Sequence, residues 1–137
     1  MTLTNRLGGI KKEFSKIAFI GPNPYLFLQH LPKSYQIKDF YFCEGNEASV
    51  EKSYEIITKS LESGGLYERL GTNVPDAIHP IVIDEEKDWR EKFEENQFDL
   101  IVNNMTLHWV NEIETTLRNY HHTLEPDGVF MSSSFGG

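Results

Sequence analysis

The sequence has little cysteine and no long hydrophobic run. Cys43 is the one cysteine among 137 residues, which excludes an internal disulfide and a cysteine-rich metal site. Cys43 ends the apolar run 40–43, where a small buried strand residue is a simpler interpretation than a reactive thiol. No segment approaches the roughly 18 apolar residues of a membrane-spanning helix, and the first residues lack the apolar stretch of a signal peptide. We therefore expect no membrane span.

Basic residues are also scarce. The chain has 13 lysines and arginines against 21 aspartates and glutamates, a formal net charge of −8. This balance repels phosphate backbones and anionic lipid headgroups, so we expect no nucleic-acid partner. The fractions of hydrophobic residues (39%) and aromatic residues (12%) exclude a disordered chain and fit one globular domain.

Short apolar runs alternate with segments of helical periodicity. Strands are expected at 17–20, 40–43, 78–83, 98–102 and 128–131, and helices at 7–14, 25–31, 50–61, around Trp89 and Phe93, and at 113–124. Glycines and a proline predict a loop or insertion at 62–77, and the residues 125–128 predict a turn before the last strand. The alternation predicts an α/β fold with a mostly parallel sheet and helices on both faces.

In such sheets ligands bind beyond the carboxyl ends of the strands, at the topological switch point. That rim would hold Gly21–Asn23, Glu44, the pair Asp84 and Glu85, and the segment 103–108. Glu44 could accept hydrogen bonds from two ribose hydroxyls, or it could be a solvated loop carboxylate. The 84–85 pair could face an adenine or could cap the following helix.

Two motifs resemble the class I S-adenosylmethionine-dependent methyltransferases. The segment FDLIVNNMTLHWVN (98–111) is similar to their fourth-strand motif, and LEPDGVF (124–130) is similar to the turn before their fifth strand. More narrowly, 107–111, 126–130 and 135–137 resemble the mitochondrial complex I assembly factors, which are methyltransferase-like arginine hydroxylases, and the related biotin-pathway malonyl-carrier methyltransferases. The resemblance is strong over 97–137, moderate over 40–54 and 81–85, and weak before residue 30.

The resemblance implies a Rossmann-like three-layer sandwich with S-adenosylmethionine as the cofactor. Residues 1–137 would form a partial methyltransferase domain of about five strands, with the parallel sheet truncated at its C-terminal side. Carried over by position, the implied cofactor residues are Gly21 and Asn23 in the glycine-rich loop, Glu44 at the ribose, Asp84 and Glu85 near the adenine, and Asn103 and Asn104 at the methionine side. His108 and Trp109 would lie on the substrate side.

The loop after the first strand departs from the family pattern. Phe19 stands where the family has an acidic residue, and Asn23 and Tyr25 stand where it has glycines. Pro22 and Pro24 also remove two backbone N–H donors. Either the loop binds the cofactor differently, or the chain has lost binding and keeps the fold.

No catalytic residue or metal ligand is assigned from the sequence. His108 could act as a base, or it could be a packed histidine at the rim. The five histidines show no recognisable ligand spacing, so we expect no metal, and arginine hydroxylation rests on resemblance alone.

Two functions follow as hypotheses. The first is an S-adenosylmethionine-dependent methyltransferase-like enzyme of the complex I assembly type, acting on a protein arginine or another acceptor, with a respiratory-complex subunit as a candidate partner. The alternative is a non-catalytic assembly or scaffold protein. The family implies a mitochondrial location, and without it the cytoplasm would be expected. An uncovered fifth strand would also favour self-association.

Overall fold

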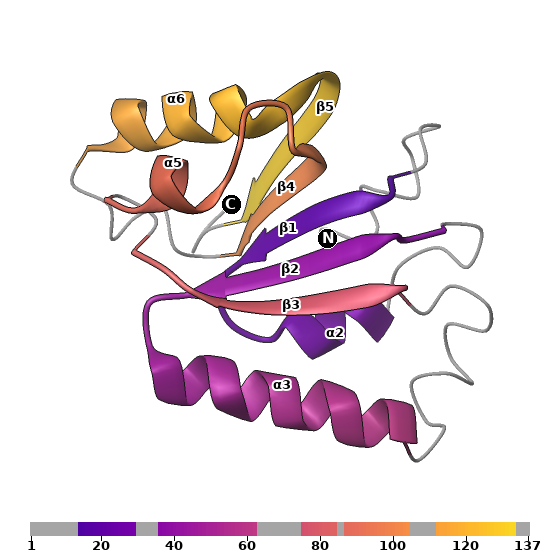
Figure 1. The fold of residues 1–137 in the computed structure, drawn as a ribbon. Helices are drawn as coiled ribbons and strands as arrows, with labels where there is room; N and C mark the ends of the chain where they lie inside the picture. Colours follow the sequence, from indigo (N-terminus) through magenta and orange to yellow (C-terminus); the bar gives the residue numbers. More distant parts are fainter. Residues whose placement is uncertain (1–13, 30–35, 63–74, 85–86, 105–111, 134–137) are drawn as a thin grey trace.

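Strands and helices alternate along the chain, as the apolar pattern predicts. The computed structural model describes residues 14–29, 36–62, 75–84, 87–104 and 112–133. In chain order the elements are β1 (Lys16–Ile20), α2 (Pro24–Gln29), β2 (Asp39–Glu44), α3 (Glu47–Glu62), β3 (Ala77–Val82), α5 (Trp89–Lys92), β4 (Phe98–Asn104), α6 (Ile113–Thr123) and β5 (Leu124–Ser133) (Figure 1). None of these helices has both the length and the apolar character needed to cross a membrane.

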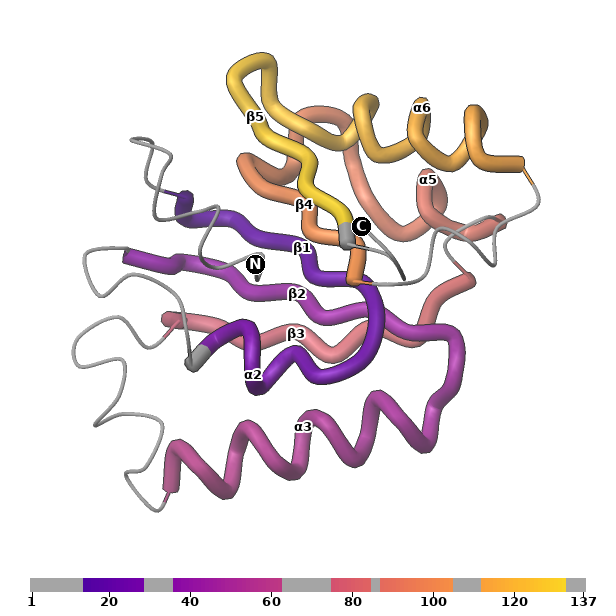
Figure 2. Tube along the Cα trace, turned by 180° about the vertical axis from the view of Figure 1, so that it is seen from behind, coloured from indigo at the N-terminus to yellow at the C-terminus, as the bar shows by residue number. Residues whose placement is uncertain are grey.

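The five strands form one parallel sheet in the order β3-β2-β1-β4-β5. Helices α2 and α3 lie on one face of this sheet, and α5 and α6 lie on the other, as Figures 1 and 2 show from opposite sides. The expected three-layer Rossmann-like α/β fold is therefore confirmed. Since the chain leaves β1 toward one face and reaches α6 on the other face after β4, the topological switch point lies between β1 and β4.

The central strand β1 contributes to two hydrophobic cores. Ile17 and Phe19 belong to the cluster beneath α2 and α3, whereas Ala18 and Ile20 belong to the cluster beneath α5 and α6. All four side chains are almost fully buried. Successive strand residues point to opposite faces, so a strand covered on both faces appears in the sequence as an uninterrupted apolar run.

The expected turn at 125–128 lies inside β5 rather than before it. Phe98 pairs with Leu124 and Leu100 pairs with Val129, so four residues of β5 bulge out of the ladder opposite Asp99. A Cβ at Gly128 would lie 2.9 Å from the Glu125 carbonyl oxygen, which explains the glycine there. The expected helix at 7–14 and loop at 62–77 fall mostly outside the described residues, although α3 extends to Glu62 and β3 begins at Ala77.

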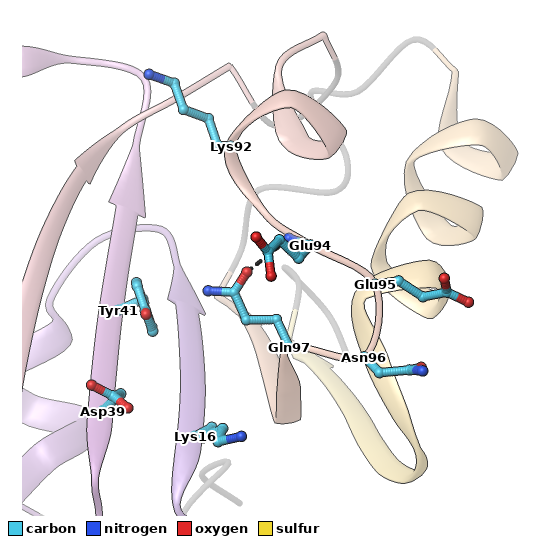
Figure 3. Close-up of a pocket in the computed structure, with 8 residues that line it drawn as sticks. All are labelled: Lys16, Asp39, Tyr41, Lys92, Glu94, Glu95, Asn96 and Gln97. Atoms are coloured by element: carbon cyan, nitrogen blue, oxygen red, sulfur yellow. Dashed lines mark hydrogen bonds between the residues drawn. The ribbon is translucent and has the colours of Figure 1, made fainter.

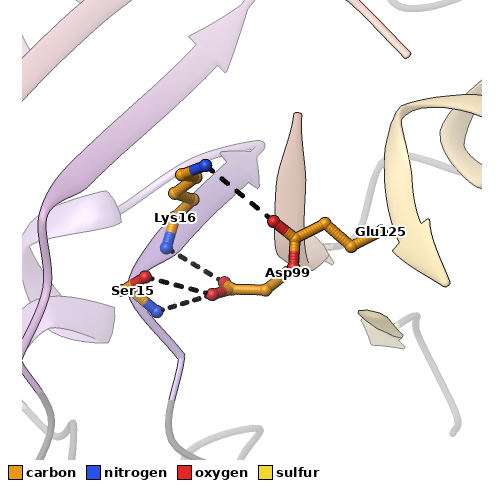
Figure 4. Close-up of polar contacts among 4 residues, drawn as sticks. All are labelled: Ser15, Lys16, Asp99 and Glu125. Atoms are coloured by element: carbon orange, nitrogen blue, oxygen red, sulfur yellow. Dashed lines mark hydrogen bonds and ion pairs between the residues drawn. The ribbon is translucent and has the colours of Figure 1, made fainter. Parts of the chain in front are cut away.

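A buried carboxylate joins β4 to the beginning of β1 (Figure 4). Asp99 is 7% exposed and accepts hydrogen bonds from the Ser15 N–H (2.8 Å), the Ser15 hydroxyl (3.3 Å) and the Lys16 N–H (3.0 Å). The Lys16 ammonium also lies 3.9 Å from the Glu125 carboxylate in an exposed ion pair. Asp99 therefore satisfies the backbone donors at the amino end of β1, at the edge opposite the predicted ligand rim.

Candidate functional site

The loop from β1 to α2 begins at the switch point and turns sharply. Gly21 has φ 116° and Asn23 has φ 64°, both in the left-handed region. Glycine adopts such angles without a steric penalty, and asparagine is among the few other residues that adopt them readily. Pro24 then occupies the first position of α2, where its missing N–H costs no helical hydrogen bond.

Few backbone donors of this loop remain for a ligand. The Gly21 N–H donates to the Cys43 carbonyl oxygen (3.1 Å), and Pro22 and Pro24 have no N–H. The Asn23 N–H has no acceptor within the described part of the chain. The loop thus offers one backbone donor, and Gly21 leaves space for close approach because it lacks a Cβ.

The two consecutive asparagines at the end of β4 have different surroundings. Asn103 is fully buried, and its side-chain amide donates to the Tyr120 hydroxyl on α6 (3.1 Å). Asn104 is half-buried, and its amide donates to the Pro22 carbonyl oxygen (2.9 Å). Of the two predicted cofactor residues, Asn104 therefore reaches the loop with its side chain, whereas the side chain of Asn103 contacts α6. The Asn104 contact was not anticipated from the sequence.

Glu44 ends β2, the neighbour of β1, and is half-buried. Burial removes water from its carboxylate and raises its pKa above the usual value. Among the described residues, Glu44 has no ion-pair partner. A partly desolvated carboxylate without a cation is suited to accept hydrogen bonds from ligand hydroxyls.

The raised pKa of Glu44 predicts a specific pH dependence of stability. The folded protein holds the proton more tightly than the unfolded chain, so this group favours folding at low pH and loses that contribution as pH rises through the folded pKa. We expect Glu44→Gln to unfold at a higher urea concentration than the wild type at pH 7. The difference should vanish near about pH 3.5, where glutamates are protonated. The exposed Glu51→Gln is the control, and equal midpoints for Glu44→Gln and wild type at pH 7 would contradict the expectation.

The remaining predicted residues are only partly accounted for. Asp84 is exposed after β3, and its carbonyl accepts the N–H groups of Lys87 (3.1 Å) and Asp88 (2.8 Å). Its own N–H donates to the Asp88 carboxylate (3.2 Å), so Asp84 shapes the turn that leads to α5. Contact with a ligand adenine stays a prediction for Asp84. Glu85, His108 and Trp109 lie outside the described residues, and their roles also stay predictions.

A hollow lies at the amino ends of β1 and β2, away from this rim (Figure 3). It has a volume of about 490 Å³ and is lined by Lys16, Asp39, Tyr41, Lys92 and the turn 94–97. Asp39 is already paired with His79 (Oδ1 to Nε2, 2.9 Å), and Gln97 accepts the Glu94 N–H (2.8 Å). Its mixed charges and its place at the amino ends make it a weaker candidate than the rim.

Known proteins share sequence with this chain. A family model described as a methyltransferase domain matches residues 66–132. The mitochondrial arginine-hydroxylase NDUFAF5 of Mus musculus is 31% identical over 135 residues, which cover 98% of this chain and 33% of that protein. The malonyl-[acyl-carrier protein] O-methyltransferase of Bacillus anthracis is 38% identical over 42 residues, covering 31% of this chain and 16% of that protein. The chain thus spans about a third of the length of the mouse protein.

Solved structures share the fold. The trans-methyltransferase CalH, crystallised with S-adenosylhomocysteine (SAH), superposes with a TM-score of 0.65 at 18% identity, covering 95% of this chain and 34% of that chain. This likeness establishes the fold, and the sequence matches bear out the resemblance seen in the motifs. By sequence and by fold, the chain is related to the class I methyltransferases, with arginine hydroxylases and malonyl-carrier methyltransferases among its relatives.

Proposed function

We propose that this chain is the cofactor-binding part of an S-adenosylmethionine-dependent, methyltransferase-like enzyme. The observation that carries the proposal is the meeting of the Gly21–Asn23 loop, Glu44 and Asn104 beside the switch point of a parallel sheet. Ligands of open α/β sheets bind at this position. The structural relative CalH, which has the same fold, was crystallised with SAH.

The residues at the rim fit this cofactor, although the set of donors is small. Glu44 would accept hydrogen bonds from the two ribose hydroxyls, which would compensate the desolvation of its carboxylate. The Asn23 N–H would donate to the carboxylate of the methionine part, and Gly21 would let the ligand approach the backbone. When bound, the cofactor would supply an electrophilic methyl group. The chain's own part is to bind and orient it, which needs few acid–base residues.

The proposals for the acceptor and for the cellular role are based on the relatives of this chain. Because the mouse relative is named a mitochondrial arginine hydroxylase, we propose a protein arginine as the acceptor and the mitochondrion as the location. A respiratory-complex subunit is the corresponding candidate partner, suggested by the likeness to complex I assembly factors. Asp84, Glu85 and Asn103 remain proposed cofactor contacts, and His108 and Trp109 remain proposed substrate-side residues.

The test is calorimetric titration of SAH into the wild type and Glu44→Gln. The variant keeps the size of the side chain but replaces the charged carboxylate, which would accept hydrogen bonds from both ribose hydroxyls, by a neutral amide. We expect its affinity to fall by about 10-fold to 100-fold, as hydrogen bonds to a charged group imply. The exposed Glu51→Gln on α3 makes the same charge change and should bind like the wild type. Equal binding by all three proteins would overturn the placement of the ribose at Glu44.

The alternative is a scaffold that keeps the fold without the cofactor. The two prolines of the loop favour it, since they leave one backbone donor where a glycine-rich loop would have several. If the wild type does not bind SAH, this alternative is the better account. Self-association through the outer edge of β5, the last strand of the described sheet, also stays a prediction.

A further inference from the structure

We propose that Asn104 is a positioning residue that holds the β1–α2 loop in its ligand-binding shape. Its side-chain amide fixes the Pro22 carbonyl, which in turn sets the direction of the Asn23 N–H. The proposal rests on the proposed function and deepens it by assigning a role to a residue that does not itself need to touch the cofactor.

The contact joins two distant parts of the chain across the switch point. Asn104 and Pro22 are 82 positions apart in sequence, and the amide nitrogen lies 2.9 Å from the carbonyl oxygen. Asn104 is the last residue of β4, and Pro22 follows β1 by two residues; the two strands are paired, with Ile20 beside Asn103 in the ladder. A hydrogen bond from the end of a paired strand to the loop restrains the loop more than a bond within the loop would.

The loop needs such a restraint because its backbone makes few hydrogen bonds that would fix its shape. Pro22 and Pro24 cannot donate, so the Gly21 N–H to the Cys43 carbonyl is the backbone anchor at the start of the turn. Asn23 lies in the left-handed region (φ 64°), which residues with a Cβ adopt less readily than glycine. The Asn104 amide supplies the second anchor, at the residue directly before Asn23.

The same contact also changes the electrostatics of the rim. The carbonyl oxygen of Pro22 carries partial negative charge, and the Asn104 amide offsets this charge by donating to it. The Asn23 N–H, which has no acceptor among the described residues, is then the backbone donor of the loop left for a ligand anion. The α-carboxylate of SAH is an anion of suitable chemistry for a single N–H donor.

The test is calorimetric titration of SAH into Asn104→Asp and Asn104→Ala. Aspartate keeps the shape but places a carboxylate against the Pro22 carbonyl, and alanine removes the donor without adding charge. We expect both to bind SAH about tenfold more weakly than the wild type, with the larger loss for aspartate. Asn96→Asp is the matched control, because Asn96 is exposed at the amino-end edge and the variant makes the same charge change. Urea unfolding midpoints of the folded variants verify that the loss does not follow general destabilisation.

A second readout separates this proposal from the proposed function. In ¹⁵N-labelled protein without ligand, the amide signal of Asn23 should move in Asn104→Ala and stay in place in Asn96→Asp. If the wild type binds SAH and Asn104→Ala binds it equally well, the positioning role is wrong and the proposed function stands. If no SAH binds but the Asn23 signal moves, the contact holds the loop and the proposed function fails. An unmoved Asn23 signal overturns the positioning role in either case.

Discussion

Replacing Trp89 by alanine should lower the free energy of unfolding by about 3–5 kcal/mol, the cost of truncating a fully buried tryptophan. Its side chain is 0% exposed, and its ring centroid lies 4.6 Å from Phe93, 4.8 Å from Tyr120 and 6.1 Å from Phe98. The indole N–H also donates to the Thr123 hydroxyl (3.0 Å). Alanine would lose all of these contacts and would leave a cavity between α5, α6 and the sheet.

The effect should be large because the helical conformation of α5 depends on the packing of Trp89. The helix has four residues, and an isolated helix of that length is not stable in water. Urea unfolding measures the loss. Trp89→Phe keeps an aromatic ring but removes the hydrogen bond to Thr123. We therefore expect it to lower the free energy of unfolding by about 1–2 kcal/mol. The exposed neighbour Glu91→Ala should change stability by less than about 0.5 kcal/mol. A loss below about 1 kcal/mol in Trp89→Ala would contradict this packing.

Replacing Asp99 by alanine should lower the free energy of unfolding by about 2–4 kcal/mol. The variant leaves two backbone N–H groups, those of Ser15 and Lys16, without the carboxylate that accepts from them. These donors lie where β1 begins, and the strand would have to replace the carboxylate with water. Asp99→Asn should also destabilise the protein. Asparagine replaces one of the two carboxylate oxygens by an NH2 group, which would face a backbone N–H donor instead of accepting from it.

The matched control for Asp99 lies in the same cluster. Glu125→Gln removes the exposed ion pair with Lys16, whose atoms are 3.9 Å apart, and should change stability by about 0.5 kcal/mol or less. Chemical denaturation of the three variants provides the comparison. If Asp99→Ala lowers the free energy of unfolding no more than Glu125→Gln does, the Asp99 carboxylate does not stabilise the start of β1.

The sequence predicts the strands and the buried core well, for a physical reason. A parallel strand covered on both faces must be apolar at every position, so the run 17–20 stands out against its polar neighbours. The sequence also predicts a helix around Trp89 and Phe93; α5 begins at Trp89, and both side chains are buried. Gly21 and Pro22 stop the first run, which places the loop correctly at the carboxyl end of β1.

The site was less predictable because it depends on contacts between distant segments. Asn103 and Asn104 were given the same role, but adjacent residues of a strand point to opposite faces. The contact between Asn104 and Pro22 needs the strand order, which the local sequence does not contain. The role of Asp99 was missed although a signal was present: a charged residue inside the apolar run 98–102 must have a partner.

The position of β1 in the centre of the sheet has a consequence for folding during synthesis. One neighbour, β2, follows soon after β1 along the chain, but the other, β4, ends at Asn104. The bond between Ser15 and Asp99 spans 84 positions. A ribosome must therefore complete most of this segment before β1 can pair on both sides. Until then, β1 and β2 expose an open apolar edge, and a chaperone that shields extended hydrophobic segments would be needed longest for them.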